Sequence, residues 1–109
     1  MSTILHITKR LEWEKAQATG RYEADSFHTQ GFIHCSTPDQ IIEVANFLFR
    51  GQTDLVLLHI DTDKLTSPVR YENLENGKTL FPHIYGPLNL EAVTEARDFP
   101  PRCDGTFAL

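Results

Sequence analysis

Cysteines, clustered basic residues and long apolar runs are all scarce in this sequence. The two cysteines, Cys35 and Cys103, lack C-x-x-C spacing, which excludes a disulfide scaffold and a zinc or redox pair. Ten Lys and Arg stand against 15 Asp and Glu, and the net charge of -5 argues against a sequence-independent grip on nucleic acid. No apolar stretch approaches the roughly 20 residues that span a bilayer, and the start MSTILHITKR lacks signal-peptide features. We therefore expect a soluble, cytoplasmic protein that does not enter a membrane.

Several motifs of binding and catalysis are also absent. No glycine-rich phosphate loop occurs, and Ser36 does not stand in a G-x-S-x-G elbow, so the sequence does not favour a serine hydrolase. Zinc would accept His6, His34 and His83 if they converged, but no pair of histidines has H-x-H or H-x-x-x-H spacing. We expect no metal cofactor.

The segments that remain predict strands joined by two helices. The 109 residues, with 40% hydrophobic and 23% charged side chains, are typical of one domain over residues 1–109. Alternating or β-branched segments predict strands at 3–8, 31–36, 54–61, 69–72, 81–86 and 91–99. Segment 54–61 is nearly continuous Leu and Val, which predicts a central strand covered on both faces. Segment 91–99 also suits a helix by composition, but its strict alternation favours a strand.

Helical periodicity and capping residues predict helices at 9–20 and 38–51. For the second helix, Ser36 or Thr37 is the expected N-cap, Pro38 the first helical residue and Gly51 the end. Asn76 and Gly77 predict a turn between two of the strands, and the tail at 99–105 is expected to wrap over the domain. The predicted class is α+β, with mixed or mainly antiparallel sheets.

Strand alternation separates the histidines from the cysteine beside them. In GFIHCS, His34 lies on one face and Cys35 on the other, so they cannot form a nucleophile and base pair, and Cys35 is expected in the core. His83 shares a face with Tyr85, and His6 lies on one face of the first strand. If these strand ends meet, they form a small-molecule pocket with aromatic stacking surface and an anion site at the second helix start. The alternative is that all three histidines are structural, as we expect for His28 and His59.

Two boxes of sequence point to a family. GFIHCST and FPHIYGPL, joined by DLVLLHIDTDKL and preceded by ILHIT, resemble a bacterial domain-of-unknown-function family of short, single-domain proteins, over nearly the whole chain. That family is grouped with the ADP-ribosyltransferase-like superfamily, whose members bind NAD in a cleft between two small sheets. The resemblance implies an ADP-ribosyltransferase-like fold and NAD as a substrate.

The resemblance also implies residues that contact the ligand. His6 matches a first-strand position that contacts the nicotinamide ribose in the superfamily, and Ser36 with Thr37 match a strand end that binds ribose or phosphate. Tyr85 joins His6 in holding the ligand. The predicted binding partner is a small molecule.

The predicted acid–base residues are His34, His83 and Glu72. Glu72 is the nearest match to the acid of the superfamily's third motif, although no E-x-E pair stands there. The enzyme hypothesis is ADP-ribosyl transfer or glycosidic hydrolysis. The alternative is a non-catalytic module that binds a small molecule or a partner protein.

Overall fold

The computed structural model describes residues 2–23, 31–73 and 79–108 of the chain. The strands and helices in these residues are β1 (Thr3–Lys9), α1 (Arg10–Thr19), β2 (Arg21–Tyr22), β3 (Ile33–His34), α3 (Ile41–Leu48), β4 (Leu55–Asp61), β5 (Val69–Glu72), β6 (Phe81–Ile84), β7 (Leu88–Asn89) and β8 (Val93–Asp98), with short 3-10 helices at Thr62–Lys64 and Leu90–Ala92. The expected turn at Asn76 and Gly77, and His28, lie outside the described residues.

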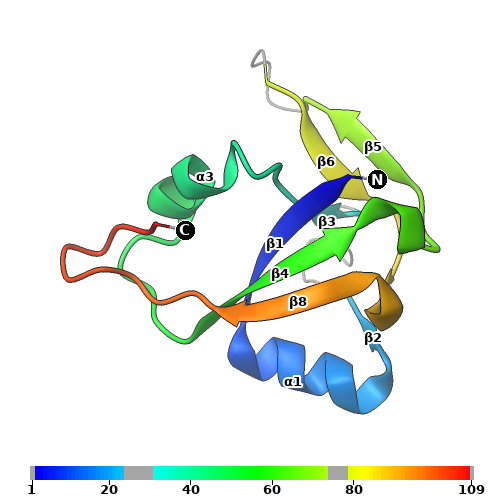
Figure 1. The fold of residues 1–109 in the computed structure, drawn as a ribbon, viewed down its shortest axis with the longest axis horizontal. Helices are drawn as coiled ribbons and strands as arrows, with labels where there is room; N and C mark the ends of the chain where they lie inside the picture. Colours follow the sequence, from blue (N-terminus) through cyan, green and yellow to red (C-terminus); the bar gives the residue numbers. More distant parts are fainter. Residues whose placement is uncertain (1, 24–30, 74–78, 109) are drawn as a thin grey trace.

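The strands form three small sheets in the described part of the chain, in the orders β1-β4-β8, β2-β7 and β3-β6-β5. Each of these pairs is antiparallel, so the class is α+β with antiparallel sheets. Figure 1 shows β4 between β1 and β8, with the β5 and β6 strands on a separate layer. The strand expected at 91–99 is confirmed as β8.

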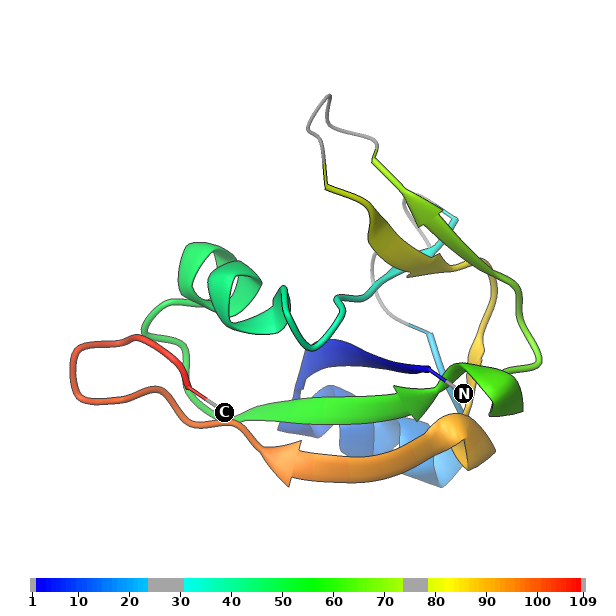
Figure 2. The same ribbon diagram turned by 45° about the horizontal axis from the view of Figure 1, so that its top comes forward.

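Strand β4 is the centre of the fold, as its Leu and Val run predicts. Its side chains alternate between two apolar clusters on opposite faces of the sheet. One cluster contains Leu58 of β4 and Trp13 of α1, whereas the other contains Leu57 of β4 and Ile41 of α3. The two helices therefore cover opposite faces of one sheet, which Figure 2 shows from a second side.

Helix α1 follows its prediction closely. Trp13 and Ala16 are its buried residues, one turn apart, because they face the core. The helix ends where Gly20 adopts a left-handed φ of 93° and its N–H donates to Ala16 O. Glycine adopts this conformation without the steric cost that a Cβ brings.

Helix α3 begins later than the sequence predicts. Thr37 to Gln40 form a tight turn in which Gln40 N–H donates to Thr37 O at 3.0 Å, and the helix starts at Ile41. The Gln40 side chain stabilises this turn, since its Oε1 accepts from Thr37 N–H and its Nε2 donates to Leu80 O. Ser36 and Thr37 are therefore not at the start of an α-helix, where the sequence predicted them, so no helix N-terminus supports the anion site expected there.

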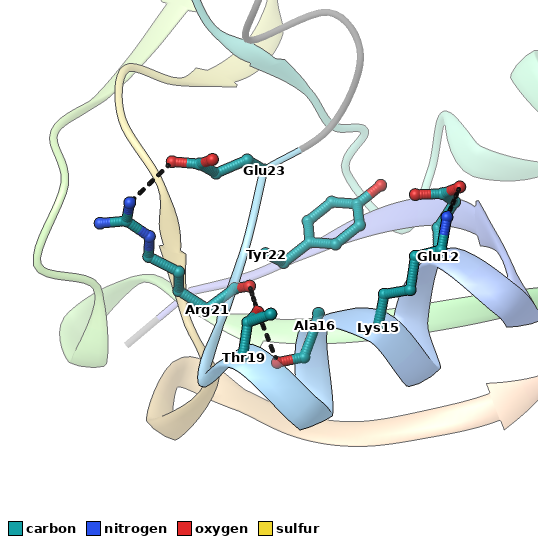
Figure 3. A pocket seen from close by; sticks show the side chains of 7 residues that line it. All are labelled: Glu12, Lys15, Ala16, Thr19, Arg21, Tyr22 and Glu23. Atoms are coloured by element: carbon teal, nitrogen blue, oxygen red, sulfur yellow. Dashed lines mark hydrogen bonds and ion pairs between the residues drawn. The ribbon is translucent and has the colours of Figure 1, made fainter.

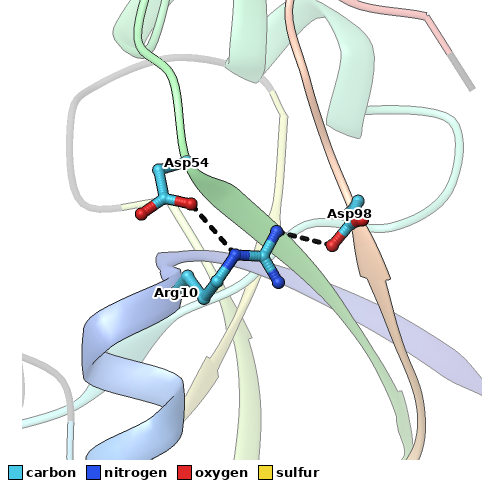
Figure 4. A network of polar contacts seen from close by, with 3 residues as sticks. All are labelled: Arg10, Asp54 and Asp98. Carbon is cyan, nitrogen blue, oxygen red and sulfur yellow. Dashed lines mark hydrogen bonds and ion pairs between the residues drawn. The ribbon is translucent and has the colours of Figure 1, made fainter.

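The ends of the main sheet are held by polar contacts and by the C-terminal tail. Arg10 donates from Nε to Asp54 and from Nη2 to Asp98, at 2.9 and 2.5 Å, which joins α1 to β4 and β8 (Figure 4). The tail folds back, as expected, so that Phe107 stacks on Phe99 with ring centroids 4.8 Å apart. Both rings are buried in the cluster on the α3 side. In the part of the chain that the structure describes, no helix is long and apolar enough to cross a bilayer.

Candidate functional site

The β3-β6-β5 sheet has an apolar inner face and a polar outer face. Ile33 pairs with Ile84, and both are fully buried in the core cluster. The next pair, His34 with His83, lies on the other face, and His83 also pairs with Arg70 of β5. We call this outer face the histidine face and define it by Phe32, His34, Arg70, Glu72, His83 and Tyr85.

Aromatic contacts order the rings of this face. Phe32 stacks on His83, with centroids 4.3 Å apart and an interplanar angle of 22°. His34 meets the edges of both rings, at 4.8 Å from Phe32 and 5.2 Å from His83. Phe32 and His83 are buried, at 5% and 4% exposure, whereas His34 is exposed. His34 therefore presents the open end of a stacked row.

The Glu72 carboxylate bonds both His83 in β6 and Tyr85, which follows the end of β6. Its Oε1 accepts the Tyr85 hydroxyl at 2.5 Å and His83 Nδ1–H at 3.0 Å. These two bonds, the one from Tyr85 first, lower the pKa of the Glu72 carboxyl, because both stabilise the carboxylate. The bond between Tyr85 and Glu72 also raises the pKa of the Tyr85 hydroxyl. With Nδ1 donating to Glu72, a neutral His83 keeps its Nε2 lone pair, which is the form a general base needs.

His6 lies behind this face rather than on it. Its Nδ1 is 2.6 Å from the backbone oxygen of His34, and its Nε2 is 2.9 Å from the Tyr22 hydroxyl, which also lies 2.9 Å from Thr8 Oγ1. Burial lowers the pKa of His6 to about 4, so its ring is neutral at neutral pH. A neutral ring that donates from Nδ1 to the His34 carbonyl accepts at Nε2 from Tyr22.

Four of the seven predicted site residues come together on the histidine face: His34, His83, Glu72 and Tyr85. His6 reaches this group through the backbone of His34, not through its side chain. Ser36 and Thr37 take structural positions instead. Ser36 is buried in a backbone bridge to Leu5 of β1, and Thr37 begins the turn before α3.

The described residues also contain an open hollow between α1 and β2, of about 300 Å³ (Figure 3). Its charged side chains pair with one another, Lys15 with Glu12 at 3.6 Å and Arg21 with Glu23 at 3.5 Å. None of the seven predicted site residues lines it. Tyr22 lines this hollow with its ring and also lies 2.9 Å from His6 Nε2 through its hydroxyl.

Cys35 has the position predicted for it. It is buried beside Ile33 in the core cluster, and this burial raises the pKa of its thiol. A protonated, enclosed thiol is a poor nucleophile. Among the residues that the structure describes, no group of three or more His, Cys, Asp and Glu side chains is placed to hold a metal ion.

Comparison with known proteins places this arrangement in a family. Residues 7–96 match the model of a family described as protein of unknown function, DUF952. The chain belongs to the DUF952 family. The crystal structure of protein CC0527 from Caulobacter crescentus has 38% identity to this DUF952 chain and a TM-score of 0.89, over 99% of this chain and 95% of that one. The solution NMR structure of CC0527 gives 38% identity and a TM-score of 0.85, over 97% and 91%. No curated protein matches the chain.

Sequence analysis missed Arg70, and it did not predict the contact that Tyr22 makes with His6 in this DUF952 protein. Tyr22 lies in a segment without clear periodicity, 16 residues from the His6 ring that it contacts, so no local pattern joins them. Arg70 could have been found, because pairing VRYE with FPHI in an antiparallel register puts it beside His83. The missing information was that register, which the residues of either strand alone do not specify.

Proposed function

We propose that this DUF952 protein binds a small nucleotide of the NAD or ADP-ribose class on the histidine face, within an ADP-ribosyltransferase-like architecture. The observation that carries the proposal is the double contact of Glu72 with His83 and Tyr85. A carboxylate that holds one histidine nitrogen orients the ring and stabilises its protonated form. Arrangements of this kind are typical of acid–base sites. The cytoplasmic location expected from the sequence is part of this proposal.

The proposed reaction is hydrolysis of the bond between nicotinamide and ribose. Water adds across that bond, and the products are nicotinamide, ADP-ribose and a proton. His83 Nε2 takes the proton from the attacking water, and Glu72 stabilises the imidazolium that forms. ADP-ribosyl transfer follows the same scheme when a hydroxyl of an acceptor replaces water.

Other residues have supporting parts in this proposal. His34 is exposed beside His83 and contacts the ligand, and Tyr85, half-buried on the same face, lies along it. His6 acts as a positioning residue, because its bond to the His34 carbonyl holds the strand that carries His34. Contacts of Ser36 and Thr37 with the ligand are not part of this proposal.

A binding module without turnover is the second candidate. The observation that favours it is the burial of His83, which is 4% exposed with Phe32 stacked over its ring. Such a protein would use His34 and Tyr85 for contact and Glu72 with His83 for rigidity.

The test combines ligand binding with turnover on the full chain. A ligand at about 100 times its dissociation constant stabilises a folded protein by about 2.7 kcal/mol, which thermal unfolding with NAD or ADP-ribose measures. Release of nicotinamide from NAD is followed by chromatography. In the enzyme, His83→Ala keeps binding and loses turnover by roughly a hundredfold or more.

Cys103→Ser is the control, since Cys103 is an exposed residue of the C-terminal tail and lies outside the site. Binding without nicotinamide release in the wild type would favour the binding module. If neither NAD nor ADP-ribose raises the melting temperature, the nucleotide proposal is wrong.

A further inference from the structure

We infer that Arg70 recognises an oxyanion, such as a phosphate, on the ligand that occupies the histidine face. The inference rests on the proposed function, which places the ligand on the histidine face. It adds that Arg70 is the residue that recognises the charged group of that ligand. Arg70 lies on β5, directly across from His83, at one end of the row that continues to His34.

The first support is that, among the described residues, the Arg70 guanidinium is in direct contact with no carboxylate, although its charge acts on Glu72 from a distance. In residues 2–23, 31–73 and 79–108, its guanidinium has neither an ion pair nor a hydrogen bond, and its side chain is exposed. By comparison, Arg10, Arg21 and Arg97 each form an ion pair with an Asp or Glu. Arg70 therefore keeps all its N–H donors for another acceptor.

The second support is that the guanidinium is held in place. Its Cζ lies 5.0 Å from the centroid of the Tyr85 ring, which is a cation–π contact. Tyr85 is in turn bonded to Glu72, so the ring beneath the guanidinium is itself fixed. A guanidinium stacked on its face leaves its edge open, and that edge matches the two oxygens of a phosphate or carboxylate.

The charges around Arg70 decide which side an anion can approach. Glu72, two residues along the same strand, keeps its negative charge while its Oε1 accepts from Tyr85 and His83, so it repels an anion from its own side of Arg70. His83 and His34 lie across the sheet from Arg70 and are neutral or positive, never negative. Because the Phe32 ring stacks over His83, which lies between Arg70 and His34, an oxyanion is most favoured at the edge of the Arg70 guanidinium that faces away from Glu72.

The experiment measures binding of three probes to the full chain by calorimetry: ADP-ribose, inorganic pyrophosphate and uncharged adenosine. Arg70→Gln is expected to weaken the binding of ADP-ribose and of pyrophosphate by roughly tenfold to a hundredfold, because charged hydrogen bonds are lost. The affinity for adenosine should stay unchanged. Arg70→Lys keeps the charge without the planar fork and is expected to give an intermediate loss.

Arg97→Gln is the matched control, since Arg97 is also an exposed arginine on an edge strand, β8, but is paired with Glu95. Equal ADP-ribose affinity in wild type and Arg70→Gln would overturn the inference and leave the proposed function standing. Binding of pyrophosphate but not ADP-ribose, with loss in Arg70→Gln, would support the inference and overturn the nucleotide proposal. Absence of all binding would overturn both.

Discussion

Two His–Tyr pairs lie in the described part of the chain, and they differ in what surrounds them. His6 and Tyr22 meet in the interior with Thr8 beside them, and their network ends on the backbone of His34. His83 and Tyr85 do not bond each other but share the Glu72 carboxylate on the histidine face. The first network holds a neutral histidine in the core, whereas the second gives a histidine a negative partner.

This difference separates a buried neutral histidine from one that has a carboxylate partner. Without a carboxylate, burial disfavours the charged ring, and the pKa of His6 falls to about 4. With a carboxylate at 3.0 Å, the imidazolium of His83 has a counter-charge. The same residue type therefore lies in an interior network in one place and beside a carboxylate in the other, and the proposed function assigns proton transfer to the second.

The largest expected effect comes from removing His6. His6→Ala leaves a cavity and deprives the His34 carbonyl and the Tyr22 hydroxyl of a partner, so the free energy of unfolding should fall by about 4 kcal/mol. His83→Ala should cost less, because the remaining partner, Glu72, is 23% exposed and can bond water. Urea unfolding of both variants checks this. An equal loss of unfolding free energy in His6→Ala and His83→Ala would mean that the two His–Tyr pairs do not differ in their contribution to stability.

The second effect is a loss of stability in acid. His6 has a pKa of about 4 in the folded state and 6.5 in the unfolded chain, so the unfolded chain binds more protons between these values. The free energy of unfolding should therefore be unaffected by the protonation of His6 above pH 6.5. Protonation of His6 in the unfolded chain should lower it by about 3 kcal/mol as the pH is reduced to 4. Unfolding measured across this range should show a flatter dependence for His6→Gln.

Asp104 provides the control for this prediction. Hydrogen bonds from Thr106 lower the pKa of its carboxyl from 3.8, so its contribution is present above pH 3.8 and is lost as the pH falls through the lower, folded value. Asp104→Asn should leave the slope between pH 6.5 and 4.5 unchanged. A flatter slope there in Asp104→Asn, and not in His6→Gln, would contradict the assignment.

The smallest effects compare the two tyrosines. Tyr22→Phe leaves His6 Nε2 buried without its partner and should lower the free energy of unfolding by about 1 to 2 kcal/mol. Tyr85→Phe should lower it less, since Glu72 Oε1 keeps its bond from His83 and can also reach water. Thermal unfolding of the two variants checks the order. A larger loss for Tyr85→Phe would mean that the histidine face, not the interior network, stabilises the fold.

Much of the fold could be predicted from local patterns. The Leu and Val run of β4 predicts a strand buried on both faces, because only that environment suits it. VRYE and FPHI predict β5 and β6, and the alternation at β3 separates His34 from Cys35. The predicted start of α3 was wrong. The Gln40 side chain bonds backbone groups of Thr37 and Leu80 and so stabilises a turn before the helix, and Leu80 is too far along the chain for a local pattern to reveal this contact.

The candidate site could be predicted only in part. That His34, His83 and Tyr85 point to one side of their strands follows from period-two alternation. That Glu72 meets His83 and Tyr85 follows from the register of β5 on β6, in which Arg70 is paired with His83. No pattern within either strand specifies that register.

By itself the sequence determined most of the strands and helices, and which side chains share a face of each of these strands. These are local properties, since alternation and helical periodicity depend on neighbours a few residues away. Only the tertiary structure decided that one histidine enters the core while another meets a carboxylate. Those contacts join residues 11 to 28 positions apart, and their geometry depends on how sheets pair and pack, which no short stretch of chain encodes.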